Sequence, residues 1–218
     1  MRIAIFSDIH GNLPALEAFV ADTRADVDMY VCLGDVVNYG PWNDECLELT
    51  LSLPGIILLE GNHERLFLGH EDIAHELPLV QQFYHHSIQN FTRRDLILDL
   101  PAEHPIGTFT CTHTIAGQRI YRDTAIEVDR DYLIGHSHHA FHIERTGFHI
   151  VNCGSIGQNR RRLDYFSYVL FDTASSRFTL TEREYPVAPL LTEMIRQGYP
   201  QPCLDYYRSK LPVQQQPS

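Results

Sequence analysis

The feature that most constrains the fold is an alternation of short apolar runs and helical patterns near the N-terminus. Residues 2–6 (RIAIF) are apolar and rich in β-branched side chains, as expected of a buried strand, and a helical pattern follows them. The runs at 29–33 and 55–60 repeat this pattern, with a second helix over about 43–53 between them. Such an alternation is typical of a parallel sheet with crossover helices. The sequence therefore predicts an α/β fold.

The second half of the chain turns toward strands. A helical spacing covers 79–92, and six strand-like runs follow it. A last helix is predicted over 187–197, ending at Gly198. The remainder, 198–218, is rich in Pro and Gln, so we expect an irregular C-terminal tail. The six strand-like runs are 108–112, 131–135, 141–145, 148–152, 165–172 and 177–185.

Composition places the chain among soluble globular proteins. It has 218 residues, of which 44% are hydrophobic and 21% are charged, and this fits one ordinary domain. The apolar runs are far shorter than the roughly 20 residues that span a bilayer. Asp8 interrupts the N-terminal run too early for a signal peptide. Five scattered cysteines without C-x-x-C spacing resemble reduced thiols, and we expect a cytoplasmic protein.

The balance of acidic and basic residues limits the kinds of molecule that the protein can bind. With 17 basic and 28 acidic residues, the formal net charge of -11 disfavours binding to a nucleic-acid polymer. A small phosphorylated substrate remains compatible, because bound cations would make an acidic site attractive to anions. A homo-oligomer is also compatible with the sequence.

Side chains of the metal-ligating type follow five of the predicted strands. The carboxyl ends of parallel strands gather at one edge of a sheet, so these side chains should converge in space. A set of oxygen and imidazole ligands without thiolates argues against a structural zinc site. Seven or eight ligands suit two divalent ions about 3.5 to 4 Å apart. The residues are Asp8, His10, Asp35, Asn62, His63, His113, His136 and His138.

In order and spacing, these motifs resemble the calcineurin-like metallophosphoesterase superfamily. Three segments, 7–19, 34–41 and 152–160, are similar to its small bacterial and archaeal phosphodiesterases, and the resemblance spans residues 1 to about 172. The motifs that carry it are Asp8-Ile9-His10, Gly34-Asp35, Gly61-Asn62-His63-Glu64, His113 and Gly135-His136-Ser137-His138.

The resemblance implies a four-layer αββα sandwich, in which helices flank two mixed β-sheets, within one domain over 1–197. Residues 64–104 would form a helical insertion and a candidate lid. Two divalent metal ions are implied, with manganese favoured and iron, zinc, nickel or cobalt as alternatives. By position, Asp8, His10 and His138 would hold one ion, Asn62, His113 and His136 the other, and Asp35 would bridge them.

The resemblance gives His63 a role of its own. In the family this histidine lies outside the metal shell, stabilises the transition state and protonates the leaving oxygen. The implied reaction is hydrolysis of a phosphoester by a hydroxide that bridges the two ions. Two cations lower the pKa of the water between them, and the leaving oxygen then needs a proton that an imidazole can supply.

One departure from the family bears on the substrate. Protein serine/threonine phosphatases and their diadenosine tetraphosphatase relatives carry Asp-Arg-Gly where this chain has Asn38-Tyr39-Gly40. The arginine that clamps phosphate is therefore missing, which favours a small phosphodiester. Arg160 could provide another anionic contact, with a solvated basic turn as the alternative. Tyr39 and Asn12 are further candidates for substrate contact, with packing and helix capping as their alternatives.

Two other functions stay open at this point. A phosphomonoesterase or protein phosphatase would use the same metal site with a different pocket. A non-catalytic interaction scaffold would share the fold, as one eukaryotic retromer subunit does, but scaffolds of this kind tend to lose the ligand residues.

Overall fold

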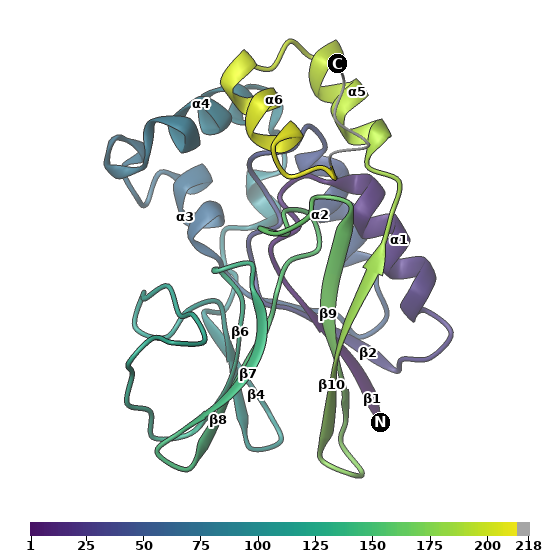
Figure 1. The fold of residues 1–218 in the computed structure, drawn as a ribbon, viewed down its shortest axis with the longest axis vertical. Coiled ribbons are helices and arrows are strands. Elements are labelled where there is room, and N and C mark those ends of the chain that lie inside the picture. Colours follow the sequence, from purple (N-terminus) through teal and green to yellow (C-terminus); the bar gives the residue numbers. More distant parts are fainter. Residues whose placement is uncertain (213–218) are drawn as a thin grey trace.

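The computed structural model, described here for residues 1–212, contains two mixed β-sheets of five strands each, with helices around them (Figure 1). This confirms the predicted arrangement of two mixed sheets flanked by helices. The first sheet has the order β10-β9-β1-β2-β3. Its strands are β1 (Arg2–Phe6), β2 (Met29–Cys32), β3 (Ile57–Leu58), β9 (Tyr165–Asp172) and β10 (Arg177–Glu184).

The second sheet has the order β4-β5-β6-β8-β7. Strands β5, β6 and β8 run parallel at its centre, and β4 and β7 pair antiparallel at its edges. In the first sheet β1, β2 and β3 are parallel. The strands of the second sheet are β4 (Glu103–Ile106), β5 (Phe109–Thr112), β6 (Asp131–Ile134), β7 (Ala140–Arg145) and β8 (Phe148–Cys153).

The two sheets pack face to face through alternate positions of their strands. In β1, Ile3 and Ile5 belong to the same apolar cluster as Leu133 and Val151 of the second sheet. Phe6, one position further on, belongs instead to the cluster shared with the helices. Successive side chains of a strand point to opposite faces. Strand β1 is therefore buried on both sides, which explains its continuous apolar sequence.

Helices cover the outer face of the first sheet. Residues of α1, α2, α5 and α6 share one apolar cluster with β1, β2 and β9, and Figure 1 shows these helices above and beside that sheet. None of the helices within residues 1–212 is long and apolar enough to cross a membrane. The helices are α1 (Leu13–Thr23), α2 (Asn43–Leu51), α3 (Asn62–Leu68), α4 (Pro78–Ser87), α5 (Ala188–Arg196) and α6 (Gln201–Arg208).

The C-terminal segment differs from the sequence prediction. The helix predicted over 187–197 is present as α5. The irregular tail predicted for 198–218 is wrong over α6, because that segment is helical and buries Tyr207 completely. Residues 213–218 of the predicted tail lie outside the described residues. Packing against the core thus outweighs the composition that suggested disorder.

The segment predicted as a helical insertion, 64–104, contains most of α3, all of α4 and the short 3-10 turns Ile73–His75, Ile88–Asn90 and Arg94–Leu96. Its last two residues begin β4, which the sequence analysis did not predict. This segment crosses from the first sheet to the second, so it passes over the edge where both sheets end their parallel strands (Figure 1).

Candidate metal centre

The predicted ligand residues stand in the loops that follow the parallel strands. Asp8 and His10 follow β1, and Asp35 follows β2. Asn62 and His63 are the first two residues of α3. The loop after β5 carries His113, and the loop after β6 carries His136 and His138. The ligand atoms form three overlapping groups within 4.8 Å: Asp8, His10 and His138; His10, Asp35 and His63; and Asp35, His113 and His136. Asn62 Oδ1 joins them, 3.1 Å from His113 Nε2.

Five of these residues have backbone angles that are unusual for residues other than glycine. Each adopts a positive φ, in the left-handed region, which costs on the order of 1 kcal/mol per residue. Such strain persists only where surrounding contacts hold it, and it is common at functional sites. The φ angles are 57° at Asp8, 52° at His10, 57° at Asp35, 67° at His136 and 59° at His138.

Three of the histidines direct their Nδ1 atoms away from the centre, toward backbone carbonyls. A carbonyl oxygen only accepts, so Nδ1 carries the proton and donates it. In the neutral ring, Nε2 then presents a lone pair to the centre, the usual arrangement of a metal-ligating histidine. The three bonds are His10 to Val37 O at 3.1 Å, His113 to Leu33 O at 2.9 Å and His138 to Gln158 O at 2.8 Å.

The centre contains buried polar atoms that lack a hydrogen-bond partner within the described residues. They include Asp8 Oδ1 and Asp35 Oδ2, which lie 3.2 Å from His138 Nε2 and 3.1 Å from His113 Nε2. The Nε2 atoms of His10 and His138 face each other at 3.2 Å. Facing lone pairs and buried carboxylates are unfavourable unless a cation lies between them. The residues therefore fit divalent metal ions.

Asp35 stands between the two halves of the cluster. Its Oδ2 lies 3.9 Å from His10 Nε2 and 3.1 Å from His113 Nε2. Its Oδ1 accepts a hydrogen bond from the backbone N–H of His63 at 2.9 Å. One oxygen is thus held by the protein and the other faces both groups of imidazoles, as a shared ligand would.

Electrostatics in the cluster follow from burial and close opposite charges. Burial raises the pKa of Asp8 and Asp35, but the neighbouring imidazoles outweigh it and hold both pKa values well below the usual range. Burial lowers the pKa of His113, yet the charge of Asp35 outweighs it and raises that pKa to about 9. Burial dominates at His136 and His138 and lowers their pKa values to about 4 and about 3.

His63 carries its proton on the other ring nitrogen. Asn38 Nδ2 donates to His63 Nδ1 at 2.9 Å, and Asn38 Oδ1 accepts from the backbone N–H of Tyr39 at 2.8 Å, which fixes the orientation of the amide. The proton of His63 is therefore on Nε2, which lies 3.8 Å from Asp35 Oδ2. Burial lowers the pKa of His63 to about 3 and keeps the ring neutral. An N–H cannot ligate a metal, so this geometry makes His63 a hydrogen-bond donor beside the cluster.

Comparison with known proteins agrees with this geometry. A family model described as calcineurin-like phosphoesterase matches residues 1–177. The chain belongs to this family. The uncharacterised protein MJ0912 of Methanocaldococcus jannaschii is 23% identical to this family member over 236 residues, covering 91% of this chain and 94% of that protein.

Solved structures include further relatives of this phosphoesterase-family chain. The crystal structure of a metallophosphoesterase from Sphaerobacter thermophilus has a TM-score of 0.79 and 26% identity, and covers 97% of this chain and 99% of that one. An archaeal phosphodiesterase has a TM-score of 0.51 and 16% identity, and covers 84% of this chain and 100% of that one. The second likeness concerns the fold alone.

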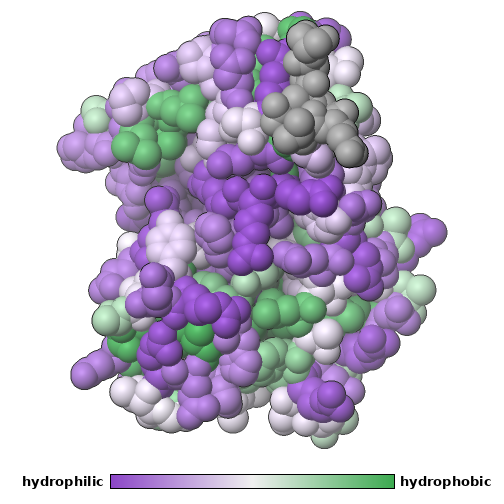
Figure 2. Space-filling model, in the orientation of Figure 1, coloured by the Kyte–Doolittle hydropathy of each residue, from purple (hydrophilic) through white to green (hydrophobic). Residues whose placement is uncertain are grey.

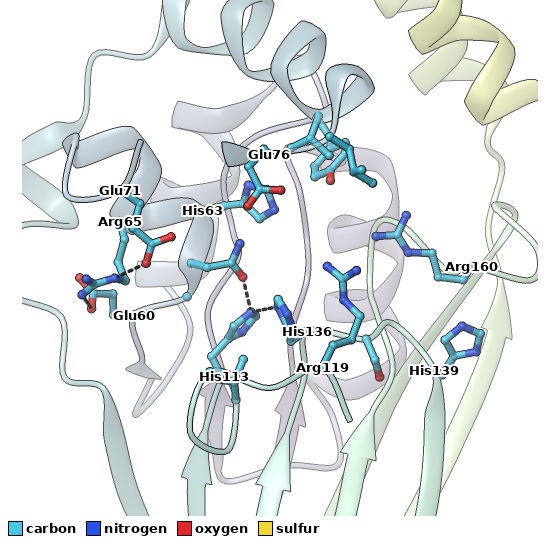
Figure 3. Close-up of a pocket in the computed structure, with 18 of the residues that line it drawn as sticks. Glu60, His63, Arg65, Glu71, Glu76, His113, Arg119, His136, His139 and Arg160 are labelled. Atoms are coloured by element: carbon cyan, nitrogen blue, oxygen red, sulfur yellow. Dashed lines mark hydrogen bonds and ion pairs between the residues drawn. The ribbon is translucent and has the colours of Figure 1, made fainter. Parts of the chain in front are cut away.

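A cavity of about 830 Å³ opens over the cluster and is lined by Tyr39, His63, His113, His136 and Arg160, among others. In Figure 3, His63, His113, His136 and Arg160 are directed toward this space. Tyr39 and Arg160, which were predicted as substrate contacts, both line this cavity, and their contact with a substrate stays a prediction.

Asn12, the third predicted substrate contact, requires a correction. Its side chain is fully buried and does not line the cavity. Asn12 Oδ1 accepts from the backbone N–H of Ala15 at 3.3 Å and caps α1. Its Nδ2 donates to Gly157 O and to Tyr185 Oη, both at 2.8 Å. All of these contacts lie inside the protein, so Asn12 supports the loop fold instead of binding a ligand.

The segment 64–104 overhangs the cavity. Leu77, Leu79 and Val80, at and just before the start of α4, line it, and the side chain of Leu77 is 69% exposed. Apolar surface is visible over the region of α4 in Figure 2, above a band of hydrophilic side chains. The segment is therefore placed as a lid would be, and its movement stays a prediction.

Glu64 is a site residue to which the sequence analysis assigned no role. Its buried carboxylate accepts four backbone N–H groups: those of Asp35 and Gly61 at 2.8 Å on Oε2, and those of Val36 at 2.8 Å and Val37 at 3.3 Å on Oε1. This joins the loop after β2 to the start of α3. A glutamate three residues after the cap Gly61 is a capping-box signal, and this pattern could have identified it.

Asn152 of β8 is a second residue without a predicted role. Its Nδ2 donates to Gly135 O at 2.6 Å and to Ser137 Oγ at 3.0 Å, which holds the loop that carries His136 and His138. Asn152 belongs to the segment 152–160 that resembles the family, but its role could not be inferred from its neighbours in sequence, because its partners lie in the loop after β6.

Proposed function

We propose that the protein is a metal-dependent phosphodiesterase that acts on a small soluble substrate. The observation that carries the proposal is the convergence of unpartnered carboxylate oxygens and imidazole lone pairs on the floor of an open cavity. Membership of the calcineurin-like phosphoesterase family supports phosphoester hydrolysis. The archaeal phosphodiesterase of similar fold supports the narrower proposal that the ester is a phosphodiester.

Two divalent cations are proposed, and their ligands follow the groups seen in the structure. Manganese is our first choice, because mixed oxygen and imidazole ligands without thiolate suit it. When bound, such a pair of cations supplies charge stabilisation and hydroxide near neutral pH. Asp8, His10 and His138 would hold one ion, Asn62, His113 and His136 the other, and Asp35 would be shared.

His63 is proposed to assist the departing group. Its Nε2–H is directed at the centre because Asn38 occupies Nδ1. A preorganised N–H in a buried site stabilises negative charge as it develops on a leaving oxygen. Tyr39 packs edge-on against His63, with ring centroids 5.1 Å apart, and restricts the rotation of the imidazole.

The loop after β2 favours a diester over a monoester. Tyr39 stands where relatives that act on phosphoproteins or diadenosine tetraphosphate carry an arginine. A phosphodiester bears one negative charge near neutral pH, whereas a monoester bears nearly two. A site with one cationic contact fewer therefore suits the diester.

The test is hydrolysis of bis-p-nitrophenyl phosphate by metal-depleted protein before and after addition of manganese. Activity is expected only after metal is added. Asp35→Asn should lower both bound metal and rate, because it removes the shared ligand charge. His63→Ala should lower kcat about 10²- to 10³-fold at unchanged metal content. His85→Ala, on the exposed side of α4, is the matched control.

An unchanged rate in Asp35→Asn or His63→Ala would contradict the mechanism. A phosphomonoesterase would show the higher kcat/KM with p-nitrophenyl phosphate at the same metal content. An interaction scaffold would retain no metal and cleave neither ester.

A further inference from the structure

One wall of the cavity is basic, although the protein as a whole has a formal net charge of -11. Arg119, Arg160 and Lys210 line this wall. Within residues 1–212, none of the three forms an ion pair with a carboxylate. Figure 3 shows Arg119 and Arg160 on the same side of the metal centre, with both side chains reaching into the cavity. We call these three residues the basic wall.

The opposite wall carries a net negative charge, because a single arginine there faces two glutamates, and Glu76 lines the cavity as well. Arg65 pairs there with Glu60, at 3.2 Å, and with Glu71, at 2.7 Å. In Figure 3 this group lies on the far side of His113 from Arg119 and Arg160. The cavity therefore has unbalanced positive charge on one side only, and an anion in it is drawn to that side.

Arg160 is held close to the metal centre by its loop. His138 Nδ1 donates to Gln158 O at 2.8 Å, so the loop that carries Arg160 is bonded directly to a ligand histidine. The side chain is partly buried and donates through Nη1 to Tyr206 Oη. A guanidinium placed in this way has several N–H donors left for a ligand.

Helix α6 brings the third cation to the same place. The Tyr206 ring is close to two positive groups, with Arg160 Cζ 5.9 Å and Lys210 Nζ 5.5 Å from its centroid. The backbone N–H of Leu163 donates to Lys210 O at 3.0 Å, which fixes the end of α6 against the Arg160 loop. Burial, and then the charges of neighbouring cations including Arg160 and Lys210, lower the pKa of His139 beside them.

A single phosphodiester does not account for this wall. The metal centre can neutralise one phosphoryl group without further help, and the cavity of about 830 Å³ has room for a much larger molecule. Arginine and lysine without carboxylate partners at a cavity surface are typical phosphate-binding groups. We propose that the basic wall binds a second phosphate, carried by the same molecule whose ester is cleaved at the metal centre. The substrate class is therefore a phosphodiester with a separate terminal phosphate.

This inference rests on the proposed function but is tested by binding as well as by turnover. Thymidine 3′,5′-bisphosphate and thymidine 5′-monophosphate differ only in the second phosphate, and calorimetry with manganese-loaded protein gives both Kd values. Their p-nitrophenyl 5′-esters, with and without the 3′-phosphate, give the matching ratio of kcat/KM. We expect the second phosphate to improve both quantities about tenfold or more at low salt, and less at high salt.

Arg119→Gln and Lys210→Gln should each reduce these ratios to below about threefold. Arg208→Gln removes a positive charge from α6 where it is paired with Asp205, outside the cavity lining, and should leave the ratios as they are. Ratios near one in the unaltered protein, or ratios unaffected by Arg119→Gln and Lys210→Gln, would overturn the inference. If neither ester is cleaved but the bisphosphate still binds more tightly, the proposed function fails and the second phosphate site stands.

Discussion

At the scale of single residues, the histidines of the centre are distinguished by which ring nitrogen carries the proton. His10, His113 and His138 donate Nδ1–H to carbonyls, which leaves an Nε2 lone pair directed at the centre in the neutral ring. His63 accepts from Asn38 at Nδ1 and presents an N–H instead. The same type of side chain thus presents either a lone pair or an N–H to the centre, depending on its hydrogen-bond partner outside it.

The buried imidazoles predict how stability depends on pH when metal is removed. His63 and His138 each have a folded-state pKa lowered to about 3, below an unfolded value of about 6.5. His136, with its pKa lowered to about 4, is a third such group. Between these values the unfolded chain binds about three more protons, so the free energy of unfolding should fall by about 4 kcal/mol per pH unit as the pH drops from 6.5 toward 4. Urea unfolding of chelator-treated protein at pH 7, 6 and 5 measures this slope.

His113 contributes to the pH dependence of stability with the opposite sign. Its pKa is raised to about 9 in the folded state, so its contribution is fully present below pH 6.5 and is lost as the pH rises toward 9. Metal-free protein should therefore be most stable near pH 6.5. His63→Gln should remove about a third of the acid-side slope, and an unchanged slope in that variant would count against this assignment.

At the scale of elements, α3 connects the two halves of the centre. It begins at Asn62, and its Glu64 accepts the N–H groups of the loop that carries Asp35. A short helix of seven residues is not stable in isolation. Here the buried carboxylate and the strand-end loops hold it in place, so ligand geometry and helix position depend on each other.

Glu64→Gln should disturb both the position of α3 and the geometry of the candidate ligands. The amide has one oxygen acceptor, and its NH₂ group would face backbone donors, so part of the four-bond network is lost. We expect the free energy of unfolding to fall by about 2 to 3 kcal/mol and metal to be released more readily. Denaturant unfolding and metal content after dialysis measure these effects. Glu45→Gln, exposed in the first turn of α2, controls for loss of charge, and equal effects of the two variants would contradict the role of Glu64.

At the scale of the whole molecule, the C-terminal helices complete both the core and the cavity. Tyr207 of α6 is fully buried and packs edge-on against Phe83 of α4, with ring centroids 5.6 Å apart. The same helix places Tyr206 at the cavity, and Lys210, two residues after the helix ends, also lines it. Helix α6 therefore contacts the segment over the site, although more than 100 residues separate them in sequence.

Tyr207→Ala should lower the free energy of unfolding by about 3 to 5 kcal/mol, as expected for removal of a large buried aromatic side chain. Thermal or urea unfolding detects the change, and Gln201→Ala on the exposed side of α6 should have an effect below about 0.5 kcal/mol. A small effect of Tyr207→Ala would show that α6 is only loosely attached.

Most strands and the set of clustered side chains could be predicted because they depend on local patterns. Strand β1 is a continuous apolar run, and Asp8 and His10 follow it directly. Strand β4 was missed, since it contains His104 and Pro105 and lies at a sheet edge, where proline is tolerated. Helix α6 was missed because its eight residues are helical through packing, and Pro202 in its first turn was a weaker signal than the overall composition.

Residue order and strand periodicity were enough to predict which side chains gather at the strand ends, because both are local properties of the chain. The protonation and the partners of these side chains depend instead on how the sheets and helices pack. The proton position on His138 depends on Gln158 O, and the basic wall depends on contact between Arg160 and Tyr206. These interactions act over a few ångströms between residues that are distant in sequence. No local pattern encodes them, and the packing of sheets and helices creates them.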